Sequence, residues 1–364
     1  MVDQGLLARV HDLTDLELAL LLCLVSREHG LLSTPADALD DLVHELRLVA
    51  GKTFGLRCVV VDCTPETTLE QFAAALLYPQ HAPGSASFQP LFAESYFVSD
   101  PRPQPWRSAS PLTTGPSAHI ANCVLAKNLD RAPRAVQIQA LELLRTRRLF
   151  TRTSVQAAPK QFVFVPVLGA ETAGEAHVTA HLNDFLSIAH WHHPEDGFVN
   201  LEDVMEDEEA AKVASTYSLV RSRNLADSHV PSAAPLISEA EISQLAQLSQ
   251  QVQVDVDVIR YQMNIVSFLR MHRAVAQGGP PPATNHFDKL MRCLAPMHKL
   301  DYVTPALVGL AARKVYLHRI RITAPENERS LQWGSRLGAV EAMLEHIGPE
   351  QVIQDVLHMV TAPL

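Results

Sequence analysis

Three short and almost continuous apolar runs alternate with amphipathic segments along the first half of the chain. They lie at 57–62, 120–125 and 162–168. Uninterrupted apolar runs of this length are typical of parallel strands that are buried inside a sheet. Parallel strands need long crossover connections, and the segments between these runs have a helical period. The sequence therefore predicts an α/β fold in which helices cover a parallel sheet.

Four helices are predicted around these strands. Leucines recur at every fourth position of 13–28, and Gly30 is expected to end this helix. Thr34 is suited to the N-cap position and Pro35 to the first helical position, so a second helix is expected from there to about residue 50. The other two helices are expected at 68–77 and 134–148.

Shifts in composition divide the chain into parts. The expected parts are a core at 1–200, an acidic and proline-containing linker at 201–235, a helical domain at 236–322 and C-terminal helices at 323–364. An insertion at 79–117 interrupts the core and combines many prolines with large apolar residues. Because long loops inside a compact domain are uncommon unless they are functional or disordered, we expect this insertion to dock a partner or to pack back onto the core.

Composition excludes several classes of protein. The chain is 47% hydrophobic, which is too apolar for a disordered protein, and its net charge of −10 excludes a basic footprint over the whole chain. No apolar run reaches the ~20 residues that span a membrane, and the first residues lack the pattern of a secretory signal. Five scattered cysteines without a C-x-x-C pair predict reduced thiols and no cysteine zinc site. We therefore expect a cytoplasmic or nuclear protein.

Two separated motifs carry a resemblance to a known family. The first, at 128–137, reads N-L-D-R-A-P-R-A-V-Q and leads into an amphipathic helix. The second begins with D-Y-V-T-P at 301–305 and ends with L-H-R-I at 317–320. With both motifs in this order, the chain resembles the AAA+ ATPases of the MoxR and magnesium-chelatase I-subunit group, fungal magnesium-chelatase-like proteins among them. The resemblance implies an AAA+ αβα core followed by a helical lid domain.

Members of that group bind ATP phosphates with a glycine-rich loop between a strand and a helix, because glycines let backbone N–H groups approach the phosphates. The resemblance places this loop at Ser33, Thr34, Pro35 and Asp37. The segment 33–39 contains neither glycine nor lysine. The tripeptide at 51–53, Gly-Lys-Thr, is no substitute, because a predicted helix precedes it where a P-loop needs a strand. We therefore expect the phosphate site to be degenerate.

The other nucleotide-site positions implied by the resemblance are altered as well. The acidic pair that holds Mg²⁺ and prepares the attacking water falls on Lys127 and Asn128. The sensor asparagine falls on Leu168, the arginine finger on Asp184 and the lid arginine on Pro282. We therefore expect no catalytic residue, no cofactor and no metal site.

Histidines form another candidate site. His177 and His181 have the i,i+4 spacing of metal ligands on a helix, and His190, His192 and His193 follow them. The glutamate of an H-E-x-x-H motif is missing. We interpret these histidines as polar surface residues and as a loop beside Trp191.

Arginines form a second cluster, at positions 145, 147, 148 and 152. Such a cluster could contact nucleic acid. The chain has a net charge of −10 and lacks aromatic residues interleaved with these arginines. We interpret the cluster as the cationic last turn of a helix, which the helix dipole favours.

The sequence thus favours a catalytically inactive, AAA+-like scaffold that binds other proteins. The alternative is a magnesium-chelatase-like or MoxR-type motor subunit that binds and hydrolyses ATP with a divergent site. A third hypothesis is an AAA+ relative that associates with nucleic acid, although we expect protein partners rather than nucleic acid or a membrane. The sequence is compatible with homo-oligomers and with hetero-oligomers.

Overall fold

The structure is a computed structural model that describes residues 4–79, 118–151, 154–204, 234–277 and 279–363. The predictions for the insertion at 79–117, apart from its first residue, and for most of the linker lie outside the described residues. None of the described helices combines the length and the apolar character that crossing a membrane requires.

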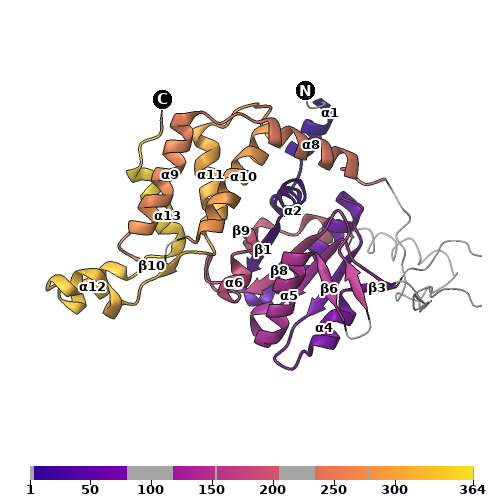
Figure 1. Ribbon diagram of the computed structural model, residues 1–364, viewed down its shortest axis with the longest axis horizontal. Coiled ribbons are helices and arrows are strands. Elements are labelled where there is room, and N and C mark those ends of the chain that lie inside the picture. Colours follow the sequence, from indigo (N-terminus) through magenta and orange to yellow (C-terminus); the bar gives the residue numbers. More distant parts are fainter. Residues whose placement is uncertain (1–3, 80–117, 152–153, 205–233, 278, 364) are drawn as a thin grey trace, which may run out of the picture.

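The core is built on a five-stranded sheet with the strand order β2-β5-β8-β1-β9. The strands are β1 (His29–Thr34), β2 (Cys58–Asp62), β5 (Cys123–Lys127), β8 (Val163–Gly169) and β9 (Leu186–Trp191). Every neighbouring pair is parallel. This confirms the predicted α/β class, since helices connect the strands and cover the sheet (Figure 1).

Burial of the strands follows their place in the sheet. The central strands β5 and β8 are buried almost throughout, as their apolar runs predict. Strand β2 lies at an edge, and Val60 is 37% exposed, so the prediction of a fully buried strand is wrong there. Strand β9 was not predicted, because Ser187 and His190 interrupt its apolar pattern.

Helix α2 (Asp15–Ser26) begins and ends close to its predicted positions, whereas α1 (Gln4–His11) was not predicted. α2 follows a capping box between Thr14 and Glu17, and the left-handed residue Arg27 ends it (φ 54°). The prediction that Gly30 ends this helix is wrong, because Gly30 lies inside β1. The other covering helices are α1 (Gln4–His11), α3 (Leu39–Leu48), α4 (Leu69–Ala75) and α5 (Arg134–Thr146).

The start of α3 also differs from the prediction. Thr34 is the last residue of β1 and its side chain is buried, so it cannot act as the N-cap. Pro35 precedes a single 3-10 turn, Ala36–Ala38, and the α-helix begins only at Leu39. Strand β1 therefore includes Ser33 and Thr34, the first two residues of the expected loop.

Three two-stranded ladders and a short helix lie outside the five-stranded sheet. They are β3 (Leu77–Pro79) with β4 (Ala118–Ile120), β6 (Arg148–Phe150) with β7 (Val155–Ala157), β10 (Val275–Gln277) with β11 (Arg321–Ile322), and α6 (Ala180–Asn183). The ladder of β3 and β4 joins the two ends of the predicted insertion.

The second half of the chain is helical, as predicted. Its helices are α8 (Glu239–Gln251), α9 (Val256–Met271), α10 (Pro281–Met297), α11 (Pro305–Tyr316), α12 (Leu337–Leu344) and α13 (Pro349–Met359). α10 packs between α8 and α11, and α13 packs against α9 and α11 (Figure 1). A capping box between Ser238 and Glu241 starts α8.

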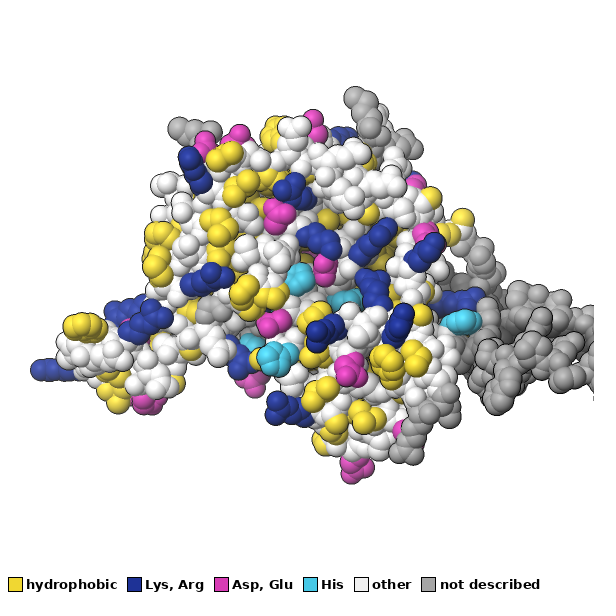
Figure 2. Space-filling model, in the orientation of Figure 1, with side chains coloured by type: hydrophobic (Ala, Val, Ile, Leu, Met, Phe, Trp, Pro, Cys, Tyr) yellow, Lys and Arg dark blue, Asp and Glu magenta, His cyan; other side chains and the backbone are white. Residues whose placement is uncertain are grey.

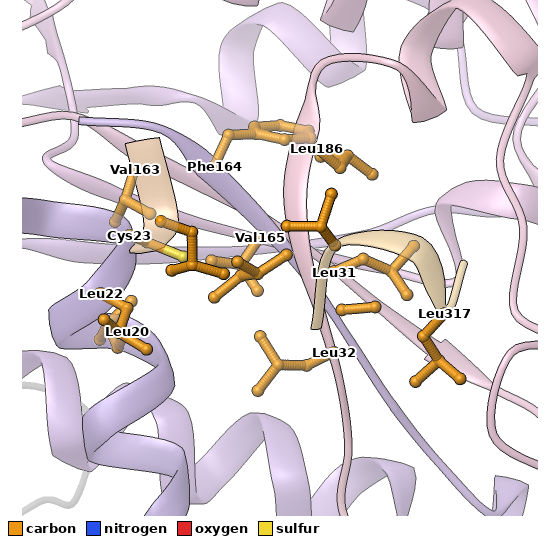
Figure 3. Packing of buried hydrophobic residues seen from close by; sticks show 14 of the residues in the cluster. Leu20, Leu22, Cys23, Leu31, Leu32, Val163, Phe164, Val165, Leu186 and Leu317 are labelled. Carbon is orange, nitrogen blue, oxygen red and sulfur yellow. The ribbon is translucent and has the colours of Figure 1, made fainter. Parts of the chain in front are cut away.

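Extensive contacts join the helical domain to the core. α8 and α10 pack against α2, and α11 covers the free edge of β9. There His318 binds the carbonyl oxygen of Leu186 (Nε2 to O, 2.9 Å), and the buried Arg319 donates to the carbonyl oxygens of Leu186 and Ser187. These side chains satisfy backbone groups that an edge strand leaves unpaired. One apolar cluster runs through both parts, and Figure 3 shows side chains of α2, β1, β8 and β9 together with Leu317.

Candidate functional site

The carboxyl ends of β1, β5 and β8 form the edge where an αβα protein of this kind binds its ligand. Ser33 pairs in register with Leu168, and Thr34 with Gly169. Lys127 ends β5 and pairs with Val167. The structure thus brings together the expected phosphate-loop, metal and sensor positions at one edge of the sheet.

The connection from β1 to α3 is too short for a phosphate-binding loop. Only Pro35 to Ala38 separate the strand from the α-helix. A P-loop motif spans about eight residues, counted from its first glycine through its final hydroxyl residue. Pro35 also has no N–H group to offer, and the N–H of Ala38 is used by the carbonyl oxygen of Pro35 (3.1 Å). This turn cannot wrap around a phosphate.

Protein atoms occupy the space beside this turn. The carbonyl oxygen of Thr34 accepts a hydrogen bond from the N–H of Ala170 (3.0 Å). A Cβ atom placed on Gly169 would lie 3.3 Å from the Cα atom of Ala36. The turn after β1 therefore packs closely against the end of β8, where a nucleotide would need room for its phosphates.

Lys127 and Asp40 form an ion pair between the end of β5 and the first turn of α3. Its members lie 87 residues apart in the sequence. The Lys127 side chain is 17% exposed and that of Asp40 is 77% exposed. Mg²⁺ requires oxygen ligands, and the resemblance to AAA+ ATPases places a metal-binding carboxylate where this chain has the ammonium group of Lys127. The ion pair joins the two elements without a metal.

Asn128 has a backbone role next to this ion pair. Its φ of 53° is left-handed, a conformation that asparagine tolerates better than most residues. Its N–H donates to the carbonyl oxygen of Val167 (3.0 Å), and its carbonyl oxygen accepts from the N–H of Arg131 (3.0 Å). Asn128 thus starts the 3-10 turn Leu129–Arg131, which leads into α5.

Asp184 lies at the opposite end of the sheet, near the amino end of β1. Asp184 follows α6 and precedes Leu186, which pairs with His29 at the amino end of β1. His286 of α10 lies 3.1 Å from the carbonyl oxygen of Asp184 (Nε2 to O). Partial burial raises the pKa of Asp184, and the nearby Arg319 opposes this shift. Pro282 is exposed in the first turn of α10.

The structure corrects the interpretation of the histidines. His177 precedes α6, which begins at Ala180, so His177 and His181 do not share a helix. His190 and His192 are buried rather than exposed in a loop, because β9 extends through Trp191. Among the described residues, no group of three or more side chains is placed to hold a metal ion.

His190 has a partner that the sequence did not indicate. Its Nδ1 atom lies 2.8 Å from the Nζ atom of Lys314 in α11. Burial, together with this lysine, lowers the pKa of His190 to about 3, so the imidazole is neutral and accepts a hydrogen bond from the ammonium group. Burial also lowers the pKa of Lys314. As with Lys127 and Asp40, the partners lie too far apart in sequence to be recognised by spacing.

Known proteins resemble this chain in fold rather than in sequence. No protein-family model and no curated protein matches it. The crystal structure of a putative ATPase from Cytophaga hutchinsonii is similar with a TM-score of 0.60 at 14% identity, covering 99% of this chain and 97% of that one. A full-length MCM homologue from Methanopyrus kandleri has a TM-score of 0.42 at 12% identity, covering 84% of this chain and 56% of its own length. The first likeness shows the fold, which is an AAA+ αβα core followed by a helical domain.

Proposed function

We propose that this protein is a catalytically inactive, AAA+-like scaffold that binds other proteins. The observation that carries the proposal is the ion pair between Lys127 and Asp40 at the carboxyl edge of the sheet. An ammonium group at this position repels Mg²⁺, and the hydrolysis of ATP depends on that metal.

The short turn after β1 supports the same conclusion independently. ATP binding needs backbone N–H groups that point at the phosphates and a lysine that reaches them. Here the turn begins with Pro35, holds Asp37 on its surface and packs against Gly169. Restoring the charge of a metal site would not restore the phosphate site, since the two defects are separate.

The surface of α9 supports a role in binding proteins. Five large apolar side chains of α9 are exposed, namely Val256 (62% exposed), Ile259 (41%), Met263 (44%), Phe268 (40%) and Met271 (62%). Large apolar side chains left exposed on one element are typical of interaction sites. A scaffold without enzymatic activity would retain such surfaces.

The MoxR and magnesium-chelatase group remains the origin that we propose for the chain. The segment Asn128 to Pro133 forms the turn that leads from β5 into α5, where the group has its N-R-A-P motif. The alternative of an active motor subunit would require a partner to supply both a phosphate loop and the metal ligands.

A turnover assay tests this proposal. The purified chain is incubated with radiolabelled ATP and Mg²⁺, and released phosphate is measured with and without an added ATPase as a positive control. We expect no release above that of ATP in buffer. Release that scales with protein concentration, and that a chelator abolishes, would contradict the proposal.

A further inference from the structure

A cationic region lies at the amino end of the sheet, on the edge opposite the degenerate nucleotide site. α2 ends at Arg27 and α5 ends at Arg147, both in left-handed conformations. The Arg147 side chain donates to the carbonyl oxygen of Arg27 (Nη2 to O, 3.3 Å). The chain returns beside Arg147 through Ala158, whose N–H donates to the carbonyl oxygen of Arg147 (2.9 Å), and reaches Lys160 just before β8. Three cations from distant parts of the sequence thus lie close together.

A hollow of about 300 Å³ lies within this region, between α2, the start of β8 and α8. Arg27 and Lys160, both exposed, stand at its rim. Apolar side chains line it, namely Leu24, Phe162, Ile242 and Ala246, each of which is largely buried. The lining also includes Gln161, Ser243 and Gln247, so the hollow combines apolar and polar groups, with Arg27 and Lys160 at its rim and Glu239 on its α8 side.

The positive charge of this region is largely uncompensated. Among the described residues, neither Arg27, Arg147 nor Lys160 forms an ion pair with a carboxylate. The next cation along this face, Lys289, does pair with Glu28. Figure 2 shows Lys and Arg side chains gathered on the face where α2, α8 and α10 meet the core. The chain as a whole has a net charge of −10, so this region is opposite in sign to the molecule that carries it.

We propose that the region around Arg27, Arg147 and Lys160 binds an acidic segment of a partner protein. In this binding mode, an apolar side chain of the segment enters the hollow, and flanking carboxylates pair with the cations at the rim. This inference rests on the proposed scaffold function and names the chemistry of one partner. The apolar lining favours a peptide over nucleic acid, because a phosphate backbone has no apolar group to place there.

Fluorescence anisotropy tests the inference with a short labelled peptide of alternating glutamate and leucine. We expect the peptide to bind, and to bind more weakly as salt is added. The double variant Arg27→Glu with Lys160→Glu should bind at least about tenfold more weakly, since two rim ion pairs together account for that ratio. A matched double variant, Lys52→Glu with Arg321→Glu, makes the same change in net charge at two exposed positions elsewhere and should bind like the parent.

Two further probes separate the binding of an acidic peptide from the binding of a neutral peptide or of nucleic acid. A peptide with glutamine in place of glutamate should bind at least about tenfold more weakly, because it lacks the charges. A labelled single-stranded oligonucleotide should bind more weakly than the acidic peptide. If the oligonucleotide binds better, or if the rim variant binds the peptide as well as the control variant does, the inference is wrong.

Each variant is tested for folding and for ATP turnover as well as for peptide binding. Circular dichroism and thermal unfolding check that each variant is folded, and Arg27→Gln with Lys160→Gln provides a milder pair in which the peptide should still bind more weakly. The ATP turnover assay is run on the same preparations. If the chain hydrolyses ATP and the rim variant still binds the peptide more weakly than the control variant, only the proposed scaffold function is wrong. If no ATP is hydrolysed and the rim variant binds the peptide as well as the control variant, only this inference is wrong.

Discussion

At the residue scale, single side chains at the sheet edges decide what the molecule can bind. Lys127 and Asp40 neutralise each other where a nucleotide-binding protein would hold Mg²⁺. Burial lowers the pKa of Arg319 to about 10. This side chain donates hydrogen bonds to backbone carbonyl oxygens of β9, the outermost strand beside the helical domain. The ion pair joins β5 to α3, and Arg319 joins the segment after α11 to β9.

Restoring the expected acidic pair should not create an ATPase. In the double variant Lys127→Asp with Asn128→Glu, the new carboxylates lie near Asp40, and the turn after β1 still offers no phosphate site. We expect no phosphate release above background and a loss of about 1–3 kcal/mol in the free energy of unfolding, from the broken ion pair and from glutamate in the left-handed conformation of residue 128. Phosphate release and urea unfolding measure the two effects. Turnover by this variant would show that the phosphate loop lies elsewhere in the chain.

Buried histidines should make the protein sensitive to mild acid. Burial, together with nearby cations, lowers the pKa of His29 to about 3, as it does for His190. Between pH 6.5 and 3 the unfolded chain binds protons that the native state excludes, so stability falls as pH falls. Each such histidine contributes a slope of about 1.4 kcal/mol per pH unit within this window.

The variant His29→Asn isolates one of these contributions. The N–H of Phe164 donates to Nδ1 of His29 (3.2 Å), and an asparagine oxygen can accept the same bond. Urea unfolding between pH 6 and 5 should show a shallower dependence of stability on pH, by about 1.4 kcal/mol per unit. His44→Asn, at an exposed position of α3, is the control and should keep the parent slope. Equal slopes in both variants would contradict the buried, neutral state of His29.

At the element scale, the sequence predicted what depends on local signals. The strands β5 and β8 and the helix α5 were predicted, because apolar runs and helical period are local patterns. Strand β9 was missed, because Ser187 and His190 interrupt its apolar run and their partners, His29 and Lys314, lie far away in the sequence. The missing glycines and lysine of the phosphate loop could be read directly from the sequence. The ion pair of Lys127 with Asp40 could be recognised only in the folded structure, because the two residues lie 87 positions apart in the sequence.

Gly30 illustrates a signal that the sequence analysis misinterpreted. It is needed for close packing and not for ending a helix, since a Cβ atom there would lie 2.7 Å from Sγ of Cys23 and 3.2 Å from Cγ1 of Ile188. We expect Gly30→Ala to lower the free energy of unfolding by about 1–3 kcal/mol. Gly51→Ala is the matched control, because nothing lies within 4 Å of its Cβ position. That variant should be neutral or more stable by up to about 1 kcal/mol.

Urea unfolding measures both glycine variants. If Gly30→Ala is as stable as Gly51→Ala, the close approach of α2 to β1 is not as the structure shows.

At the scale of the whole molecule, the fold is AAA+-like, and the turn after β1 packs closely against the end of β8. The core and the helical domain share one apolar cluster, and α10 and α11 pack directly onto α2 and β9. Such a large shared core favours a single rigid body over a lid that moves with nucleotide. We therefore expect the molecule to act by binding partners on its surface.

Thermal unfolding in the presence of ATP and Mg²⁺ tests this central claim most directly. A ligand that binds the native state adds about 2.7 kcal/mol of stability at 100-fold excess over its Kd, which raises the melting temperature by several degrees. The account predicts the same melting temperature with and without millimolar ATP and Mg²⁺. A clear rise that disappears when the metal is chelated would contradict it.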